Sequence, residues 1–174
     1  MTLHGLWPNL ISGANFPDCN KGDDIIVNIE DNSLLDSMRQ MWISYSGADE
    51  NFWSHEYNKH GLCYSNKTQT ESYINFFSKV IEIFKHNDFE NIISDIVDSS
   101  TEAEISMTTH ELRESISKKY PYIKYDFYCK KFDNKFHLVE IRINLDLDFN
   151  NIEFTRARTN CPTSQPIFIS KFIQ

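Results

Sequence analysis

The chain has 174 residues, of which 40% are hydrophobic and 14% aromatic, so it can bury a sizeable core and we expect one domain over residues 1–174. The net charge of −8 comes from 25 acidic and 17 basic residues, which argues against a protein that holds nucleic acid through a broad basic face. No segment approaches the roughly 18 consecutive apolar residues of a membrane span, so no membrane partner is expected.

The first two thirds of the chain carry helical patterns. Residues 8–31 contain Pro and Gly among polar residues and are expected to form a loop. Apolar residues then recur at helical spacing over 34–45, with Ser33 as the expected N-cap. A second short helix is expected over 52–62, and the apolar face of residues 73–84 predicts a third.

Further helices are expected before the pattern changes. Isoleucines and a valine over 92–97 indicate a short helix, and Thr108 with Glu111 has the spacing of a capping box that opens a helix through Ile116. Residues 139–149 then alternate apolar and polar side chains, which predicts a long half-buried strand.

Three other segments are candidate partners of that strand. They are residues 125–130, residues 152–154 and residues 167–171. The sequence thus predicts an α+β fold in which several helices pack on an antiparallel sheet.

The four cysteines are widely spaced, without a CxxC pair that would suggest zinc. Two disulfides are the preferred interpretation, four free buried thiols are the alternative, and the sequence leaves three pairings open. The residues concerned are Cys19, Cys63, Cys129 and Cys161.

Asn66 begins an Asn-Lys-Thr triplet, an acceptor for N-glycosylation. Together with the cysteines it predicts a secreted or endolysosomal or vacuolar glycoprotein. Because the first residues lack the basic start and apolar stretch of a signal peptide, we expect that Met1 lies inside a longer precursor.

The segment from His55 to His60 concentrates ionisable groups. On a helix, His55 lies one turn from Lys59 and Glu56 lies one turn from His60. An exposed, charged helical turn is the structural alternative to a functional site.

Other kinds of active site fit this segment poorly. A zinc helix needs HExxH with histidines four residues apart, whereas these are five apart with a lysine between them. A Cys63 nucleophile would be lost in a disulfide, and no GxSxG, GxxxxGK[ST] or GxGxxG motif occurs. No metal or other cofactor is therefore expected.

Phosphodiester cleavage by two imidazoles would use all of these groups. One imidazole takes a proton from the nucleophile and the other gives a proton to the leaving oxygen, while a cation and a carboxylate stabilise the charge on phosphorus. His4, in the sequence HGLWPN, is the candidate for the second imidazole. Taken alone, His4 would more often be an ordinary structural histidine, and Trp7 a core residue.

The segments HGLWPN at 4–9 and FWSHEYNKHGLC at 52–63 resemble the two active-site segments of the ribonuclease T2 family, HGLWP and FWxHEWxKHGTC. Both occur in the order and spacing of the family. The resemblance implies metal-independent cleavage of single-stranded RNA through a 2′,3′-cyclic phosphate, with low base specificity and no action on DNA. We expect a monomeric enzyme.

The resemblance also implies roles for individual residues. His60 is the expected general base and His4 the general acid, while Glu56 and Lys59 stabilise the pentacovalent phosphate and His55 binds phosphate. Trp7, Asn9 and Phe52 match positions that contact the two bases. The family pattern pairs Cys19 with Cys63, and Cys129 with Cys161.

The chain departs from the family pattern in three places. Tyr57 replaces a tryptophan, and Leu62 replaces a threonine. Family members also have a strand before the opening motif, and this chain begins too late to include it, so we expect a sheet without that strand. The alternative function is a noncatalytic ribonuclease-like protein for storage, recognition or defence, and a metal-dependent hydrolase using His55 and His60 is a third.

Overall fold

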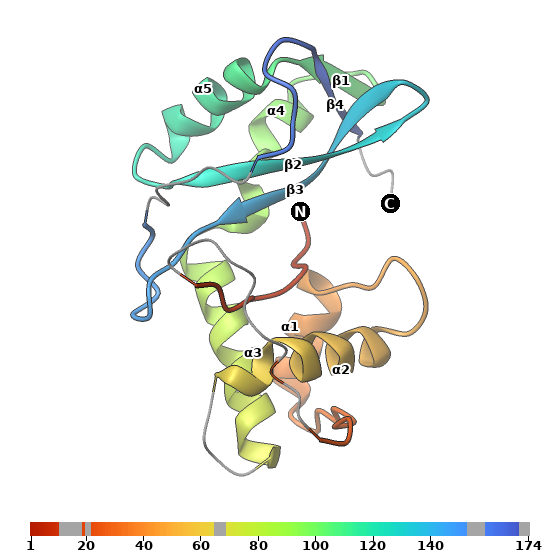
Figure 1. Ribbon diagram of the computed structural model, residues 1–174, viewed down its shortest axis with the longest axis vertical. Helices are drawn as coiled ribbons and strands as arrows, with labels where there is room; N and C mark the ends of the chain where they lie inside the picture. The colour runs from red at the N-terminus through yellow and green to blue at the C-terminus, as the bar shows by residue number, and fades with distance from the viewer. Residues whose placement is uncertain (11–18, 20–21, 65–68, 153–158, 171–174) are drawn as a thin grey trace. The chain divides into compact units, whose positions relative to one another are not determined.

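The computed structural model describes residues 1–10, 19, 22–64, 69–152 and 159–170 (Figure 1). The chain forms two compact units, Met1–Glu90 (unit 1) and Asn91–Gln174 (unit 2). Among the described residues, no helix has the length and apolar character needed to cross a membrane. The family-like fold class, α+β, is confirmed, because helices build unit 1 and a four-stranded sheet lies in unit 2.

Unit 1 consists of α1 (Asn32–Met41), α2 (Asp49–Lys59), the 3-10 turn η1 (Gly61–Cys63) and α3 (Gln69–His86). The apolar face expected over 73–84 is the core face of α3. Aromatic rings from α2, from α3 and from the C-cap of α1 meet there and are almost fully buried. They are Trp42, Trp53, Tyr57, Phe76 and Phe77.

The ends of α1 differ from expectation. Asp31, rather than Ser33, is the N-cap, and its carboxylate accepts hydrogen bonds from the backbone N–H groups of Ser33 and Leu34. The helix stops at Met41, because Trp42 leaves the helical conformation with φ −125° and ψ 63°. Tyr45 therefore lies outside the helix and is 72% exposed.

Unit 2 contains α4 (Ser94–Asp98), β1 (Glu104–Met107), α5 (Thr109–Lys119), β2 (Tyr125–Phe132), β3 (Lys135–Ile143) and β4 (Ile167–Ser170). The short 3-10 turn η2 (Phe89–Asn91) spans the boundary between the units. The sheet has the strand order β1-β4-β3-β2, and Figure 1 shows α5 alongside it.

The expected capping box of α5 is present. The Thr108 hydroxyl accepts from the backbone N–H of Glu111, and the Glu111 carboxylate accepts from the backbone N–H of Thr108. Leu112 and Ile116 on the inner face of α5 are fully buried with Phe127 and Ile167 of the sheet. The periodic apolar positions of this helix thus account for the core of unit 2.

The sheet differs from expectation in four respects. Strand β3 ends at Ile143 rather than 149, and β1 was not expected at all. Strands β3 and β4 pair in parallel over two residues, so the sheet is mixed rather than wholly antiparallel. Ile152 is not in a strand, and residues 153–154 of that expected strand lie outside the described residues, as does Lys171 after β4.

The end of β3 has a local cause. The Asp146 carboxylate accepts hydrogen bonds from the backbone N–H groups of Asp148 and Asn150, and Phe149 adopts φ 64°. These bonds fold the chain into a turn. The alternation of apolar and polar residues therefore continues past the point where the strand stops.

Candidate active site

Two hydrogen bonds attach the opening segment to the end of α1, and a third bond holds Trp42, the donor of one of them. The Leu3 N–H donates to the Met41 carbonyl over 2.6 Å, and the Trp42 indole N–H donates to the His4 carbonyl over 2.8 Å. The Trp53 indole N–H in turn donates to the Trp42 carbonyl over 2.7 Å. Both indoles are fully buried. The backbone of His4 is thus fixed by a chain of two tryptophans that starts in α2.

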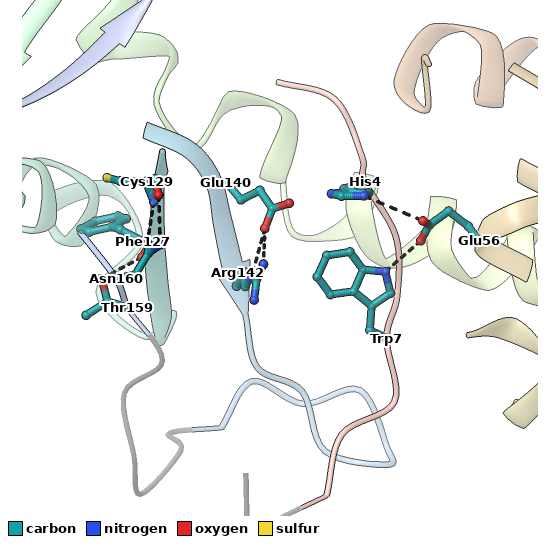
Figure 2. Close-up of polar contacts among 9 residues, drawn as sticks. All are labelled: His4, Trp7, Glu56, Phe127, Cys129, Glu140, Arg142, Thr159 and Asn160. Carbon is teal, nitrogen blue, oxygen red and sulfur yellow. Dashed lines mark hydrogen bonds and ion pairs between the residues drawn. The ribbon is translucent and has the colours of Figure 1, made fainter. Parts of the chain in front are cut away.

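The Glu56 carboxylate lies between His4 and Trp7 (Figure 2). Its Oε1 is 3.8 Å from His4 Nε2, and its Oε2 accepts a 2.8 Å hydrogen bond from Trp7 Nε1. The Glu56 side chain is 3% exposed, whereas that of His4 is 50% exposed. The buried carboxylate therefore orients two side chains of the opening segment, and the His4 ring stays accessible to a ligand.

Trp7 also connects His4 to His60. Its ring lies 4.8 Å from the His4 ring and 5.5 Å from the His60 ring, measured between centroids. His60 is the C-cap of α2, and its backbone N–H donates to the Glu56 carbonyl. His4 of the first motif and His60 of the second motif thus contact the same indole.

Burial raises the pKa of Glu56, while the Trp7 hydrogen bond and then the positive charges of His4, His55 and Lys59 act in the opposite direction. His55 and Lys59 are themselves exposed. Because cationic groups surround a single carboxylate, this end of unit 1 offers positive charge to an anionic ligand despite the acidic balance of the chain.

The three expected base-contacting residues are less closely grouped. The Phe52 ring lies 5.8 Å from the His4 ring and is half-buried. Trp7 lies within the site, with its N–H engaged by Glu56. Asn9 is exposed, and its side-chain amide donates to the Trp7 carbonyl over 3.3 Å. Phe52 and Trp7 therefore flank His4, while Asn9 lies farther along the opening segment.

Gly5 also shapes the site, although no sequence pattern predicts a role for it. A Cβ atom at position 5 would overlap Glu56 Oε2 and the Trp7 indole nitrogen. Glycine therefore lets the backbone approach the carboxylate closely enough for the Trp7–Glu56 hydrogen bond to form. The only signal in the sequence is the position of this glycine between His4 and Trp7.

Two further residues of α2, Ser54 and Asn58, support the site without a predicted role. The Asn58 side chain accepts from the Ile25 N–H and donates to the Ile25 carbonyl, both over 2.8 Å. The Ser54 hydroxyl accepts from the Val27 N–H over 3.0 Å. The chain that precedes α1 is therefore fastened along the helix that carries Glu56. Asn58 stands within the motif but has no signal for this role.

Two disulfides are present, Cys19–Cys63 and Cys129–Cys161, with Cα–Cα distances of 5.2 and 5.0 Å. They are the two pairs that the family resemblance implies. The first joins Cys19 to Cys63 in η1, the turn that directly follows His60. Asn66 lies outside the described residues, so its predicted glycosylation stays a prediction.

The arrangement can support proton transfer at an anionic ligand. Two imidazoles contact one indole, and the buried Glu56 carboxylate, 3.8 Å from His4, can stabilise the protonated form of that histidine. Within the described ranges, no group of three or more His, Cys, Asp or Glu side chains has the geometry to hold a metal ion.

Comparison with known proteins gives a consistent result. The family model of the ribonuclease T2 family matches residues 1–161. Ribonuclease Rh from Rhizopus niveus is 37% identical over 97 residues, which cover 47% of this chain and 41% of the relative. Ribonuclease T2 protein rnst-2 from Caenorhabditis elegans is 26% identical over 182 aligned positions, covering 98% of this chain and 60% of the relative.

The chain spans only about half the length of the curated relatives it matches, from 31% to 60% in those compared. Among solved structures, the Japanese pear S3-RNase matches with a TM-score of 0.71 at 22% identity, covering 98% of this chain and 85% of the other. Actibind, a T2 ribonuclease, matches with a TM-score of 0.70 at 24% identity, covering 93% and 76%. The chain belongs to the ribonuclease T2 family.

Proposed function

We propose that the chain is an endoribonuclease that cleaves single-stranded RNA without a metal, by attack of a ribose 2′-hydroxyl on the adjacent phosphate. The products are a 2′,3′-cyclic phosphate and a free 5′-hydroxyl. The requirement for a 2′-hydroxyl excludes DNA as a substrate. Family membership supports the ribonuclease activity, and the shared contact of two imidazoles with Trp7 supports the mechanism.

In this mechanism His60 removes the proton from the 2′-hydroxyl and His4 gives a proton to the departing 5′-oxygen. For that role His4 must be protonated at the start of the reaction, and the negative charge of Glu56 at 3.8 Å favours that form. Glu56 and Lys59 would stabilise the pentacovalent phosphate, and the exposed His55 would bind a phosphate oxygen.

Base binding would come from aromatic rings rather than from a basic surface. Trp7 would stack on one base, with Asn9 donating or accepting a hydrogen bond, and Phe52 would contact the second. Stacking contributes about 1 to 3 kcal/mol per base and is tolerant of base identity. We therefore propose low base specificity, which fits a chain whose net charge is −8.

The wider setting is also a proposal. Disulfides persist in oxidising compartments, so the two disulfides support a secreted, endolysosomal or vacuolar location. We further propose that the protein acts as a monomer and that units 1 and 2 form one functional domain.

The single observation that carries the proposal is the placement of His4, Trp7, Glu56 and His60 in one set of contacts. The test is incubation of the disulfide-intact protein with a dinucleoside monophosphate at mildly acidic pH in the presence of a chelator. We expect a 2′,3′-cyclic phosphate product, with no turnover of the matching deoxy compound.

The other outcomes separate the alternatives. Absence of any product would favour a noncatalytic protein for storage, recognition or defence. Activity that disappears in chelator would instead favour a metal-dependent hydrolase.

A further inference from the structure

The face of the sheet opposite the core carries a row of aromatic side chains across three strands. In the strand register, Lys130 on β2 lies opposite His137 on β3, and His137 lies opposite Phe168 on β4. Phe132 shares a face with Lys130, because side chains two residues apart point the same way. On the other face, Cys129, Ile167 and Ile169 are buried in the core.

The rings of this row are in contact with one another. The Phe132 and His137 centroids are 5.7 Å apart, and those of His137 and Phe168 are 5.8 Å apart. Phe132 is nevertheless 53% exposed. Large aromatic side chains are usually buried, so an exposed ring continuous with two others is a candidate contact surface. We call Lys130, Phe132, Lys135, His137 and Phe168 the aromatic row.

Positive charge accompanies the rings. The Lys135 ammonium lies 4.4 Å from the centroid of Phe168 and 2.9 Å from a Glu104 carboxylate oxygen. His137 Nδ1 is 3.5 Å from the other oxygen of Glu104. Glu104 thus orients Lys135 and His137 while offsetting one positive charge. Lys130 is exposed beside them and adds a further ammonium group.

The turn between β2 and β3 fixes the row in place. Asp133 and Asn134 have φ values of 46° and 62°, the left-handed conformation of a tight two-residue hairpin turn that matches the strand twist. Figure 1 shows this end of the hairpin beside β4. The rings therefore stand on a rigid surface, which lowers the entropic penalty of binding.

We propose that the aromatic row binds single-stranded RNA, separately from the residues around His4 and His60. Bases stack on rings carried by a sheet face, and ammonium groups contact the neighbouring phosphates. The charge of the ligand complements the lysines in a chain that is otherwise acidic. This inference rests on the proposed function for its choice of RNA, and it predicts that longer RNA contacts the protein beyond the cleaved dinucleotide.

The test uses isotope-labelled protein with intact disulfides and an RNA of about twelve nucleotides, within the site sizes of single-strand binders. Every ribose carries a 2′-O-methyl group, so the RNA cannot be cleaved. We expect NMR shifts at backbone amides of β2 and β3 near the turn. Phe132→Ala and Lys130→Glu should each weaken the affinity fitted from those amides by about fivefold or more.

Matched controls come from the same unit. Tyr122→Ala removes a ring that is 88% exposed, and Lys118→Glu reverses an exposed charge on α5. Both should leave the fitted affinity unchanged. The proposal fails if the hairpin amides do not shift, or if the controls weaken binding as much as the test variants do. It also fails if only phosphatidylserine vesicles, and not the RNA, bind through the hairpin.

A dinucleotide cleavage assay tests the proposed function separately from RNA binding at the hairpin. The Phe132→Ala and Lys130→Glu variants should cleave a dinucleotide at the same rate as the unmodified protein, since neither residue lies among the groups proposed for catalysis or for binding the two bases. If the unmodified protein binds RNA at the hairpin but does not cleave a dinucleotide, only the catalytic proposal is overturned.

Discussion

Unit 1 and unit 2 use their buried residues differently. In unit 1, the fully buried Trp42 and Trp53 form the hydrogen-bonded chain that ends at the His4 carbonyl. In unit 2, the core joins the inner faces of α5 and the sheet, and none of the proposed catalytic residues belongs to it. Core packing and site geometry therefore depend on the same residues in unit 1 only. Mutations in the two units should separate stability from turnover.

The largest effect should follow removal of an imidazole in unit 1. His60→Ala and His4→Ala should each lower dinucleotide turnover by about 10²- to 10⁴-fold, the usual contribution of a positioned acid or base. His110→Ala in unit 2 is the control, because His110 is exposed and pairs only with Glu114 among the described ion pairs. Steady-state assays decide the matter, and full activity of His4→Ala would end the two-imidazole mechanism.

The disulfides provide the next largest contrast. Each should stabilise the protein by about 3 to 4 kcal/mol in the chain-entropy model. Replacing both cysteines of Cys19–Cys63 by serine should reduce turnover as well as Tm, since this bond anchors the chain directly after His60. Replacing Cys129 and Cys161 should lower Tm alone. If turnover falls by the same factor for each degree of lost Tm in both variants, the two units do not differ in this respect.

A smaller effect is expected for Trp42→Phe, which deletes the indole N–H and leaves the His4 carbonyl without that donor. The free energy of unfolding should fall by about 2 to 3 kcal/mol, because the smaller ring also leaves a cavity at a fully buried position. Turnover should fall with it, because the His4 backbone is no longer fixed. The matched variant in unit 2 is Tyr125→Phe, which loses the hydrogen bonds of the hydroxyl to the Arg113 carbonyl and to the Ser117 hydroxyl. It should destabilise the fold by about 1 to 2 kcal/mol while kcat is retained, and denaturation and kinetics together measure both quantities.

The smallest expected effect concerns Glu56. Burial raises its pKa above 4.5 in the folded state, so the folded protein binds more protons than the unfolded chain between the two pKa values. The stability contribution of Glu56 is therefore complete below the unfolded pKa and is lost as pH rises through the folded pKa. The Tm of the unmodified protein should exceed that of Glu56→Gln by more near pH 4 than near pH 7. An advantage that grows with pH would contradict the sign of the shift.

Much of the fold could be predicted because local signals agreed with tertiary packing. The capping box of Thr108 and Glu111 forms the hydrogen bonds that its spacing predicts, and the aromatic face of α3 is buried as its periodicity predicts. Strand β1 was missed because its four residues, Glu104–Met107, are too short to show a period. The end of β3 was missed because a side-chain bond of Asp146 overrides a continuing alternation.

The candidate site was predicted only in part. The motifs placed His4, Glu56 and His60 in one site, and the structure brings each of them into contact with Trp7. The residues that hold the site in place were not predictable, because an indole N–H or a side-chain amide that bonds to a distant backbone group leaves no local sequence pattern. Trp42 was interpreted only as an apolar face residue, and Asn58 received no role.

Gly5 has a consequence for how this family member would respond to random substitution. Any other amino acid at position 5 would place a Cβ atom against the Glu56 carboxylate and the Trp7 indole and so displace at least one of them, although glycine itself offers no acid, base or charge. A saturation screen scored on turnover would thus rank position 5 beside the histidines. Intolerance to substitution at this position would report the space that the neighbouring groups require, and it would say nothing about chemistry performed there.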